Sequence, residues 1–170
     1  MSAEGRLIHE SSMKFGPIPD ERLFYIEQSE VYKNLGQGYR CAEFVWLKDR
    51  RLYVIEAKSS SPRPAVEENG VNLFNDYIQR IADKFNVSWQ LFLAAYTGRQ
   101  DRQDMGYMLQ QCSLAEVSVT LILIIHGHKT EWLPPLQEAL SRKMAKLSCI
   151  WRMQVAVIND QEARARKMIA

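Results

Sequence analysis

Two glutamates and a lysine stand in a stretch of sequence that is otherwise largely apolar. In "AEFVWLKDRRLYVIEAKSSS", residues 42–61, the runs of hydrophobic and aromatic residues are interrupted by Glu43, Glu56 and Lys58. Carboxylate oxygens are hard ligands of the kind that Mg²⁺ prefers. A bound divalent cation lowers the pKa of its water and polarises a phosphoryl oxygen. A neighbouring lysine can stabilise negative charge in a transition state or help to position the attacking water. These residue types therefore point to metal-assisted hydrolysis.

The two apolar runs have the pattern of a β-hairpin, with strands at about residues 39–48 and 51–58 and a turn at "KDRR". Side chains alternate between the faces of a strand. A two-residue loop and a four-residue loop give the same register, in which Glu43 faces Glu56 and Lys58 follows on the same face. Opposed like charges destabilise a sheet, and burial raises that cost unless a cation compensates it. The register thus predicts a metal site beside a lysine.

A simpler explanation is a solvated ion pair between Glu56 and Lys58 on an exposed strand face. The apolar run "YVI" that leads into Glu56 favours the buried alternative, because it indicates that this end of the strand enters the core.

The remaining sequence supplies helices and strands in alternation. A helix is expected from about Gly70 to Tyr96, either continuous or broken near Asn86, because its apolar residues recur at spacings of three and four. "VSVTLILIIHG" is apolar on both alternating faces, which is typical of a central strand. A helix at about 134–146, a strand at "CIWRMQVAVIND" and a terminal helix follow. This order predicts an α/β fold with a mixed central β-sheet flanked by helices.

The ends of the chain are less regular in pattern. Residues 1–19 are expected to be irregular because of Gly16, Pro17 and Pro19. Residues 20–38 form an element that is either helix or strand. The 170 residues suit one domain spanning the whole chain, in which residues 127–170 form a C-terminal extension.

Composition excludes several classes of protein. The net charge is only +2, no apolar run approaches the roughly 20 residues of a membrane span, and the first residues lack the apolar core of a secretory signal. Three widely spaced cysteines form neither a metal-ligand pair nor a disulfide framework. A cytoplasmic protein without a membrane partner is expected.

The segment "RRLYVIEAKSSS" resembles the E-x-K half of the PD-(D/E)xK nuclease superfamily, and Glu43 in "YRCAEFVWL" falls where the family's first acid falls. The resemblance covers roughly residues 20–126. It implies a restriction-endonuclease-like core and catalytic roles for Glu43, Glu56 and Lys58. It also implies Mg²⁺ or Mn²⁺ held by the two glutamates and the backbone carbonyl of Ala57, with Glu27 as a supporting acid.

Residues after the motif are candidates for contact with nucleic acid. Ser59, Ser60 and Arg63 follow the lysine directly, and Lys129 follows the central strand. His126 and His128 also follow that strand, but two histidines without a further ligand are a weak metal signal. An ordinary strand-end loop is the alternative for all of these residues.

The function expected from the sequence is a Mg²⁺-dependent endo- or exodeoxyribonuclease, a hydrolase acting on DNA. Such small domains often work as homodimers, although nothing in the sequence proves one. The alternative is a catalytically inactive nuclease-fold module that binds nucleic acid or a protein partner. A structural α/β domain with a solvated charged patch is the third hypothesis.

Overall fold

The computed structural model describes residues 4–64 and 68–170. Its elements alternate between strands and helices after an N-terminal hairpin. In chain order they are β1 (Arg6–Glu10), β2 (Met13–Ile18), η1 (Asp20–Arg22), β3 (Leu23–Phe24), η2 (Ile26–Gln28), α1 (Glu30–Lys33), β4 (Phe44–Lys48), β5 (Arg51–Lys58), α2 (Glu68–Tyr96), α3 (Tyr107–Gln111), β6 (Ser118–Ile125), η3 (Thr130–Trp132), α4 (Leu133–Lys143), α5 (Ala145–Trp151), β7 (Gln154–Asn159) and α6 (Asp160–Ala165).

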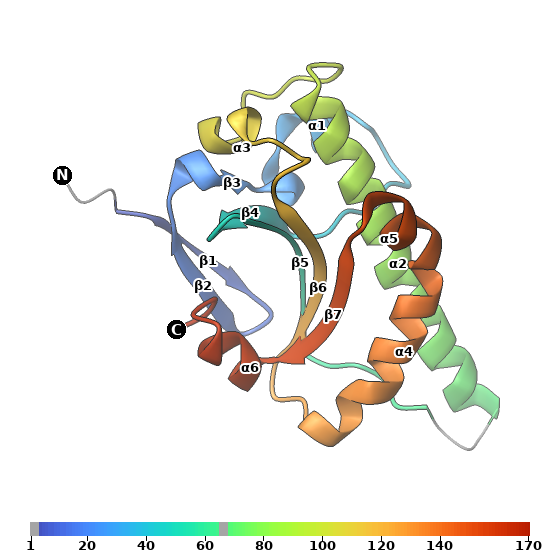
Figure 1. Cartoon of the computed structure of the whole chain (residues 1–170). Helices are drawn as coiled ribbons and strands as arrows, with labels where there is room; N and C mark the ends of the chain where they lie inside the picture. The colour runs from blue at the N-terminus through green and yellow to red at the C-terminus, as the bar shows by residue number, and fades with distance from the viewer. Residues whose placement is uncertain (1–3, 65–67) are drawn as a thin grey trace.

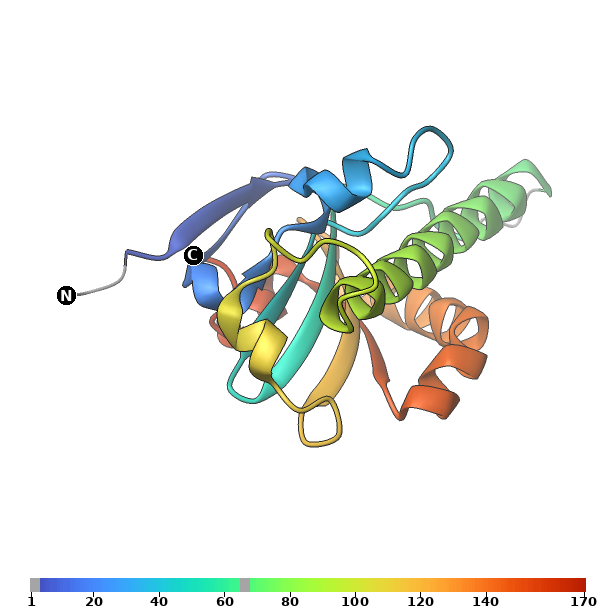
Figure 2. The same ribbon diagram turned by 90° about the horizontal axis from the view of Figure 1, so that it is seen from above.

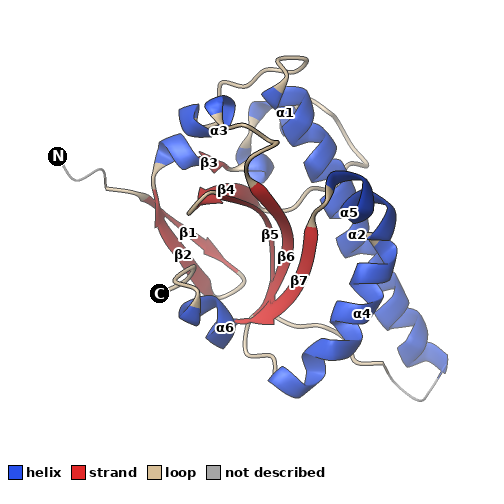
Figure 3. Ribbon diagram, viewed as in Figure 1, coloured by secondary structure: helices blue, strands red, loops and turns tan. Residues whose placement is uncertain are grey.

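A five-stranded mixed sheet forms the centre of the molecule, in the order β3-β4-β5-β6-β7 (Figures 1 and 3). The first three strands are antiparallel neighbours, whereas β5, β6 and β7 run parallel to one another. Helical crossovers separate the parallel strands, as parallel pairing requires. The predicted α/β class with a mixed sheet and flanking helices is therefore confirmed.

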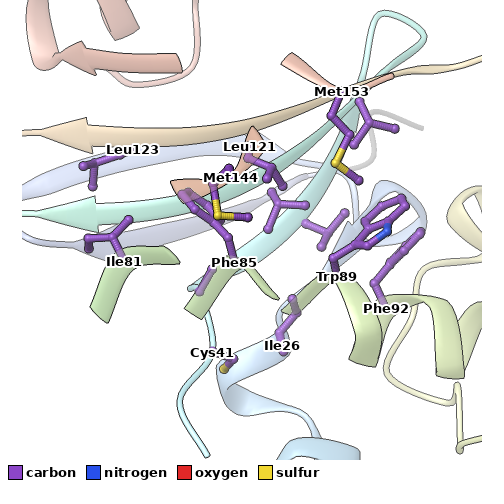
Figure 4. Packing of buried hydrophobic residues seen from close by; sticks show 14 of the residues in the cluster. Ile26, Cys41, Ile81, Phe85, Trp89, Phe92, Leu121, Leu123, Met144 and Met153 are labelled. Atoms are coloured by element: carbon purple, nitrogen blue, oxygen red, sulfur yellow. The ribbon is translucent and has the colours of Figure 1, made fainter. Parts of the chain in front are cut away.

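One face of the sheet is covered by α2 and α4, and the core between them is shown in Figure 4. Phe85 and Trp89 of α2 are buried against Leu121 and Leu123 of β6. The helix runs unbroken through Asn86, so the alternative of a break there is wrong. Within the described residues, no helix is both long enough and apolar enough to span a membrane.

The opposite face is covered by the β1–β2 hairpin and α6 (Figures 1 and 2). The prediction that residues 1–19 are irregular was wrong for residues 6–18, which form this hairpin, and its first three residues lie outside the described part of the chain. Ser11 and Ser12 both have positive φ and make a two-residue turn between Glu10 and Met13. Met13, Phe15 and Ile18 of β2 are buried. Proline has no amide to donate, and the outer edge of β2 is bonded through its other residues: the Gly16 amide donates to the Met168 carbonyl at 3.1 Å, and the Lys14 carbonyl accepts from the Ala170 amide at 3.0 Å.

The C-terminal segment differs from the prediction in its boundaries. The helix expected to about residue 146 ends at Lys143, and α5 follows it. The residues "CIW" lie in α5, which ends at Arg152 in the left-handed conformation, so β7 begins only at Gln154. The side chain of Gln137 in α4 then covers the free edge of β7: its amide donates to the Val155 carbonyl and accepts from the Val157 amide, each at 2.8 Å.

Candidate functional site

The β4–β5 hairpin places Glu56 and Lys58 at the carboxyl end of the central parallel strands. Its turn is the two-residue loop Asp49–Arg50, in which both residues have positive φ. Because Lys48 pairs with Arg51, the predicted register is confirmed along the whole ladder. Glu56 lies at 0% exposure in the interior of the sheet, whereas the side chain of Lys58 is partly exposed at the strand's last residue.

Glu43 lies one residue before the ladder begins. Its amide donates to the carbonyl of Ile55 at 3.0 Å, so the backbone pairing is offset by one residue at this point and the predicted direct pairing with Glu56 is not made. Two contacts hold this segment: the Ala42 amide donates to the buried hydroxyl of Ser88, and the Glu27 amide donates to the Glu43 carbonyl. Glu43 is nevertheless buried, at 6% exposure.

Three acidic side chains converge at Glu43. Carboxylate oxygens of Glu10, Glu27 and Glu43 all lie within 4.8 Å of one another, and we call this group the acid cluster. Burial raises the pKa of Glu43 to about 9, with further contributions from a hydrogen bond with Glu27 and from the charge of Glu56. The pKa of Glu43 is therefore raised both by the other acids of the cluster and by Glu56 of β5. At neutral pH the carboxyl group of Glu43 holds a proton.

Glu10 reaches the acid cluster from the tip of the N-terminal hairpin. The hydroxyl of Tyr25 donates to its Oε1 at 2.5 Å. Burial and this carboxylate raise the pKa of Tyr25, so the hydroxyl stays protonated and remains a donor. In the described part of the chain, no lysine or arginine forms an ion pair with any carboxylate of the acid cluster.

Glu56, by contrast, has two cationic partners on the same oxygen. The ammonium groups of Lys58 and Lys84 lie 2.8 and 2.7 Å from its Oε1. Lys84 comes from α2, and its pKa is raised because the charge of Glu56 and the hydrogen bond to it outweigh the lowering effect of burial. The second oxygen, Oε2, is buried without a hydrogen-bond partner among the described residues.

The carbonyl of Ala57, which the sequence resemblance implies as a metal ligand, accepts a hydrogen bond from the Ser11 hydroxyl at 3.0 Å. A carbonyl oxygen has two lone pairs, so this contact leaves one of them available. The same hairpin tip thus supplies both Glu10 and Ser11 to the site.

The candidates for nucleic-acid contact divide into two groups. Ser59 and Ser60 are exposed in the loop after β5. Arg63 and Lys129 instead gather around Trp132, with the Arg63 guanidinium 3.4 Å and the Lys129 ammonium 5.0 Å from the ring centroid.

His128 joins the two loops that carry these cations. Its ring packs edge-on against Trp132, and its Nε2 lies 3.3 Å from the Ser61 hydroxyl. Burial and the charge of Arg63 lower the pKa of His128, so the ring is neutral at neutral pH. The loops after β5 and β6 therefore form one surface beside Lys58.

The structure brings Glu27 and Glu43 together in the acid cluster and pairs Glu56 with Lys58, and the charge of Glu56 acts on Glu43. The sequence singled out all four residues. The structure adds Glu10, Ser11 and Lys84, which sequence reasoning missed. For Lys84 a signal existed: it lies one helical turn after the buried Ile81, beside Phe85, on the apolar face of α2. For the hairpin residues no local signal existed.

The oxygen donors of this site fit a hard divalent cation such as Mg²⁺ or Mn²⁺. The test is the crowding of acidic groups: among the described residues no lysine or arginine pairs with Glu10, Glu27 or Glu43, and the buried Oε2 of Glu56 has no hydrogen-bond donor. Comparison of the chain with protein-family models, curated proteins and solved structures gives no match. Any function therefore has to be argued from the site itself.

Proposed function

We propose that this protein is a metal-dependent nuclease that hydrolyses phosphodiester bonds, with DNA as its substrate. The observation that supports the proposal best is that the acid cluster lies at the same end of the sheet as Glu56 and Lys58. Crowded acidic groups are costly in their charged form, and a divalent cation relieves that cost while serving chemistry. The sequence resemblance of "VIEAK" to the PD-(D/E)xK superfamily points to the same reaction.

In this proposal each residue has a separate task. Glu43 and Glu56 hold Mg²⁺ or Mn²⁺, together with the carbonyl of Ala57, and Glu10 and Glu27 complete the negative environment. The bound cation supplies a water of lowered pKa and polarises the phosphoryl oxygen. Lys58 stabilises the negative charge that develops on the phosphate as the bond to the leaving oxygen breaks.

The experiment is a cleavage assay with plasmid, linear and single-stranded DNA and with RNA, in Mg²⁺, Mn²⁺ or EDTA. We expect metal-dependent cleavage that falls about 100-fold or more in Glu56→Gln and Lys58→Met, since each removes a charge from the reacting centre. Glu116→Gln and Lys143→Met are matched controls, because both side chains are exposed. Cleavage that persists unchanged in Glu56→Gln, or that is absent with every substrate and metal, would overturn the proposal.

One observation favours the alternative of a module that binds without cutting. The Ser11 hydroxyl occupies one lone pair of the Ala57 carbonyl, as expected if no metal ever uses it. The variant Ser11→Ala separates the two functions: a nuclease keeps or gains activity when this carbonyl is freed, whereas a binding module stays inactive and retains its affinity for nucleic acid.

A further inference from the structure

The two lysines on Glu56 exceed what one carboxylate needs. Glu56 carries a single negative charge, yet Lys58 and Lys84 both contact its Oε1 at less than 3 Å. One ammonium already neutralises the charge and donates a hydrogen bond. The second positive charge at the same oxygen requires a separate explanation.

The two lysines differ in how firmly the fold holds them. Lys84 lies in the interior of the 29-residue helix α2, and its side chain is only 17% exposed. Lys58 is the last residue of β5, is followed by the exposed Ser59, and has a side chain that is 31% exposed. Lys84 is therefore fixed on a rigid helix, whereas Lys58 lies at the end of a strand with solvent on one side.

We propose that Lys84 is the permanent counter-ion of Glu56 and that this frees Lys58 to leave the carboxylate and contact the substrate phosphate. A buried carboxylate that loses its only cation is strongly disfavoured. With Lys84 in place, Glu56 keeps one partner when Lys58 moves, so the movement has a low cost. The substrate part of this inference rests on the nuclease proposed above, whereas the counter-ion part does not. Lys84 is thus a positioning residue that acts through Lys58.

A double-mutant cycle tests this division of roles. Lys84→Met should lower turnover at least about tenfold, because Lys58 becomes the sole counter-ion and is held at Glu56. In a Lys58→Met background, Lys84→Met should lower turnover no further, since the effects of two residues that act through one group are not additive. Losses that multiply in the double variant, or unchanged turnover in Lys84→Met, would overturn the inference. Arg80→Met, an exposed cation one turn earlier on α2, is the matched control.

Metal affinity distinguishes this role from a merely structural one. Titration calorimetry with Mn²⁺ should give a Kd for Lys84→Met that is equal to or lower than that of the wild type, because a positive charge near the cation has been removed. A damaged fold would weaken Mn²⁺ binding and turnover together. The variant Lys84→Arg keeps the charge and should retain turnover and folding, so it keeps the test decisive if Lys84→Met fails to fold.

A third measurement does not require any cleavage. The ¹⁵N order parameters of the lysine ammonium groups should show that Lys58 is more mobile than Lys84 in the wild type, and that Lys58 becomes ordered in Lys84→Met or Lys84→Gln. Equal order parameters for the two ammonium groups would refute the counter-ion role even in a protein that cuts DNA. So would a Lys58 order parameter that is the same in the wild type and in the Lys84 variants. A confirmed shift in a protein that cuts nothing would leave Lys84 assigned and would refute the nuclease.

Discussion

Two buried carboxylates at the same end of the sheet, where the parallel strands have their carboxyl ends, have opposite environments. Asp160 follows the last residue of β7, is 8% exposed, and accepts hydrogen bonds from the Gly127 amide at 2.8 Å and from Arg164 at 2.9 Å. Burial alone would raise the pKa of Asp160. The two hydrogen bonds lower it by a larger amount, so the pKa lies below the ordinary value of an aspartate. Glu43 is equally buried but has acids as its nearest polar side chains, and its pKa is raised.

The contrast separates a carboxylate that its own chain satisfies from one that we propose to bind a ligand. Asp160 is satisfied by its own chain and joins the loop after β6 to the start of α6. Glu43 carries a cost that the fold itself does not relieve, which is typical of residues that await a ligand. The useful criterion is therefore what surrounds a buried acid rather than its burial, and each prediction below tests that criterion.

The largest expected effect is the pH dependence of stability in EDTA. The pKa of Glu43 rises from 4.5 in the unfolded chain to about 9 in the folded protein. Between these values the folded state binds more protons than the unfolded state, so the free energy of unfolding falls as pH rises, by at most about 1.4 kcal/mol per pH unit. Urea unfolding of the wild type and Glu43→Gln from pH 5 to pH 9 measures it, and Glu43→Gln should lose less stability over this range.

Asp160 supplies the opposite sign in the same experiment. Its lowered pKa means that its contribution to stability is complete above the usual range of an aspartate and is lost as pH falls through the folded-state value. Asp160→Asn should therefore change stability most at neutral pH and least in acid. If Glu43→Gln and Asp160→Asn followed the same pH trend, the distinction between the two carboxylates would be wrong.

The second prediction concerns the cation. At a free Mn²⁺ concentration of 100 Kd, binding to the folded state adds about 2.7 kcal/mol, which corresponds to a rise in Tm of about 5–10 °C for a domain of this size. Differential scanning fluorimetry in Mn²⁺ and EDTA should show this rise in the wild type and in Asp160→Asn. It should be absent in Glu43→Gln, because the acid cluster loses a ligand; an equal rise in all three proteins would place the metal elsewhere.

Much of this candidate site can be predicted from the sequence, because several of its residues lie close together along the chain. Glu56 and Lys58 follow an apolar run in one strand, and the hairpin turn fixes the register that brings Glu43 near them. Alternation along two adjacent strands is a short-range pattern, so a single sequence can reveal it. The offset of one residue at Glu43 depends on contacts from Ser88 and η2, which no pattern in the hairpin encodes.

The parts that the sequence concealed depend on distant segments. Glu10 and Ser11 reach the site only because the β1–β2 hairpin packs across the sheet, and its prolines predicted the opposite of a strand. The position of Lys84 on the apolar face of α2 could be read from the sequence, but its ion pair with Glu56 depends on how α2 packs against the sheet. Tertiary packing decided both cases, whereas the α/β class with a mixed sheet followed from the alternation of helices and strands along the chain.

The third prediction is a loss of stability that should be independent of metal. Asp160→Ala removes the acceptor of the Gly127 amide, and a hydrogen bond to a charged group contributes about 1.5–3 kcal/mol. Asp160→Asn retains an acceptor for this amide and loses only the partner of Arg164, so it should cost less. Urea unfolding at pH 7 in EDTA checks the order of the two variants. An equal loss in the two variants would show that the ion pair with Arg164, which both variants remove, matters more than the acceptor of the Gly127 amide.

The smallest effect concerns the two cations around Trp132. They form a cluster of positive charge, in contrast to the acid cluster. Arg63 and Lys129 share one aromatic ring, and no carboxylate forms an ion pair with either in the described part of the chain. If this surface contacts a nucleic-acid backbone, each change to alanine should weaken binding about fivefold and lower the slope of log K against log salt by about 0.9. Fluorescence anisotropy with duplex DNA in EDTA measures both quantities. Lys146→Ala is the control, because this exposed lysine on α5 lies at the opposite end of β7; an equal loss there would reduce the effect to net charge.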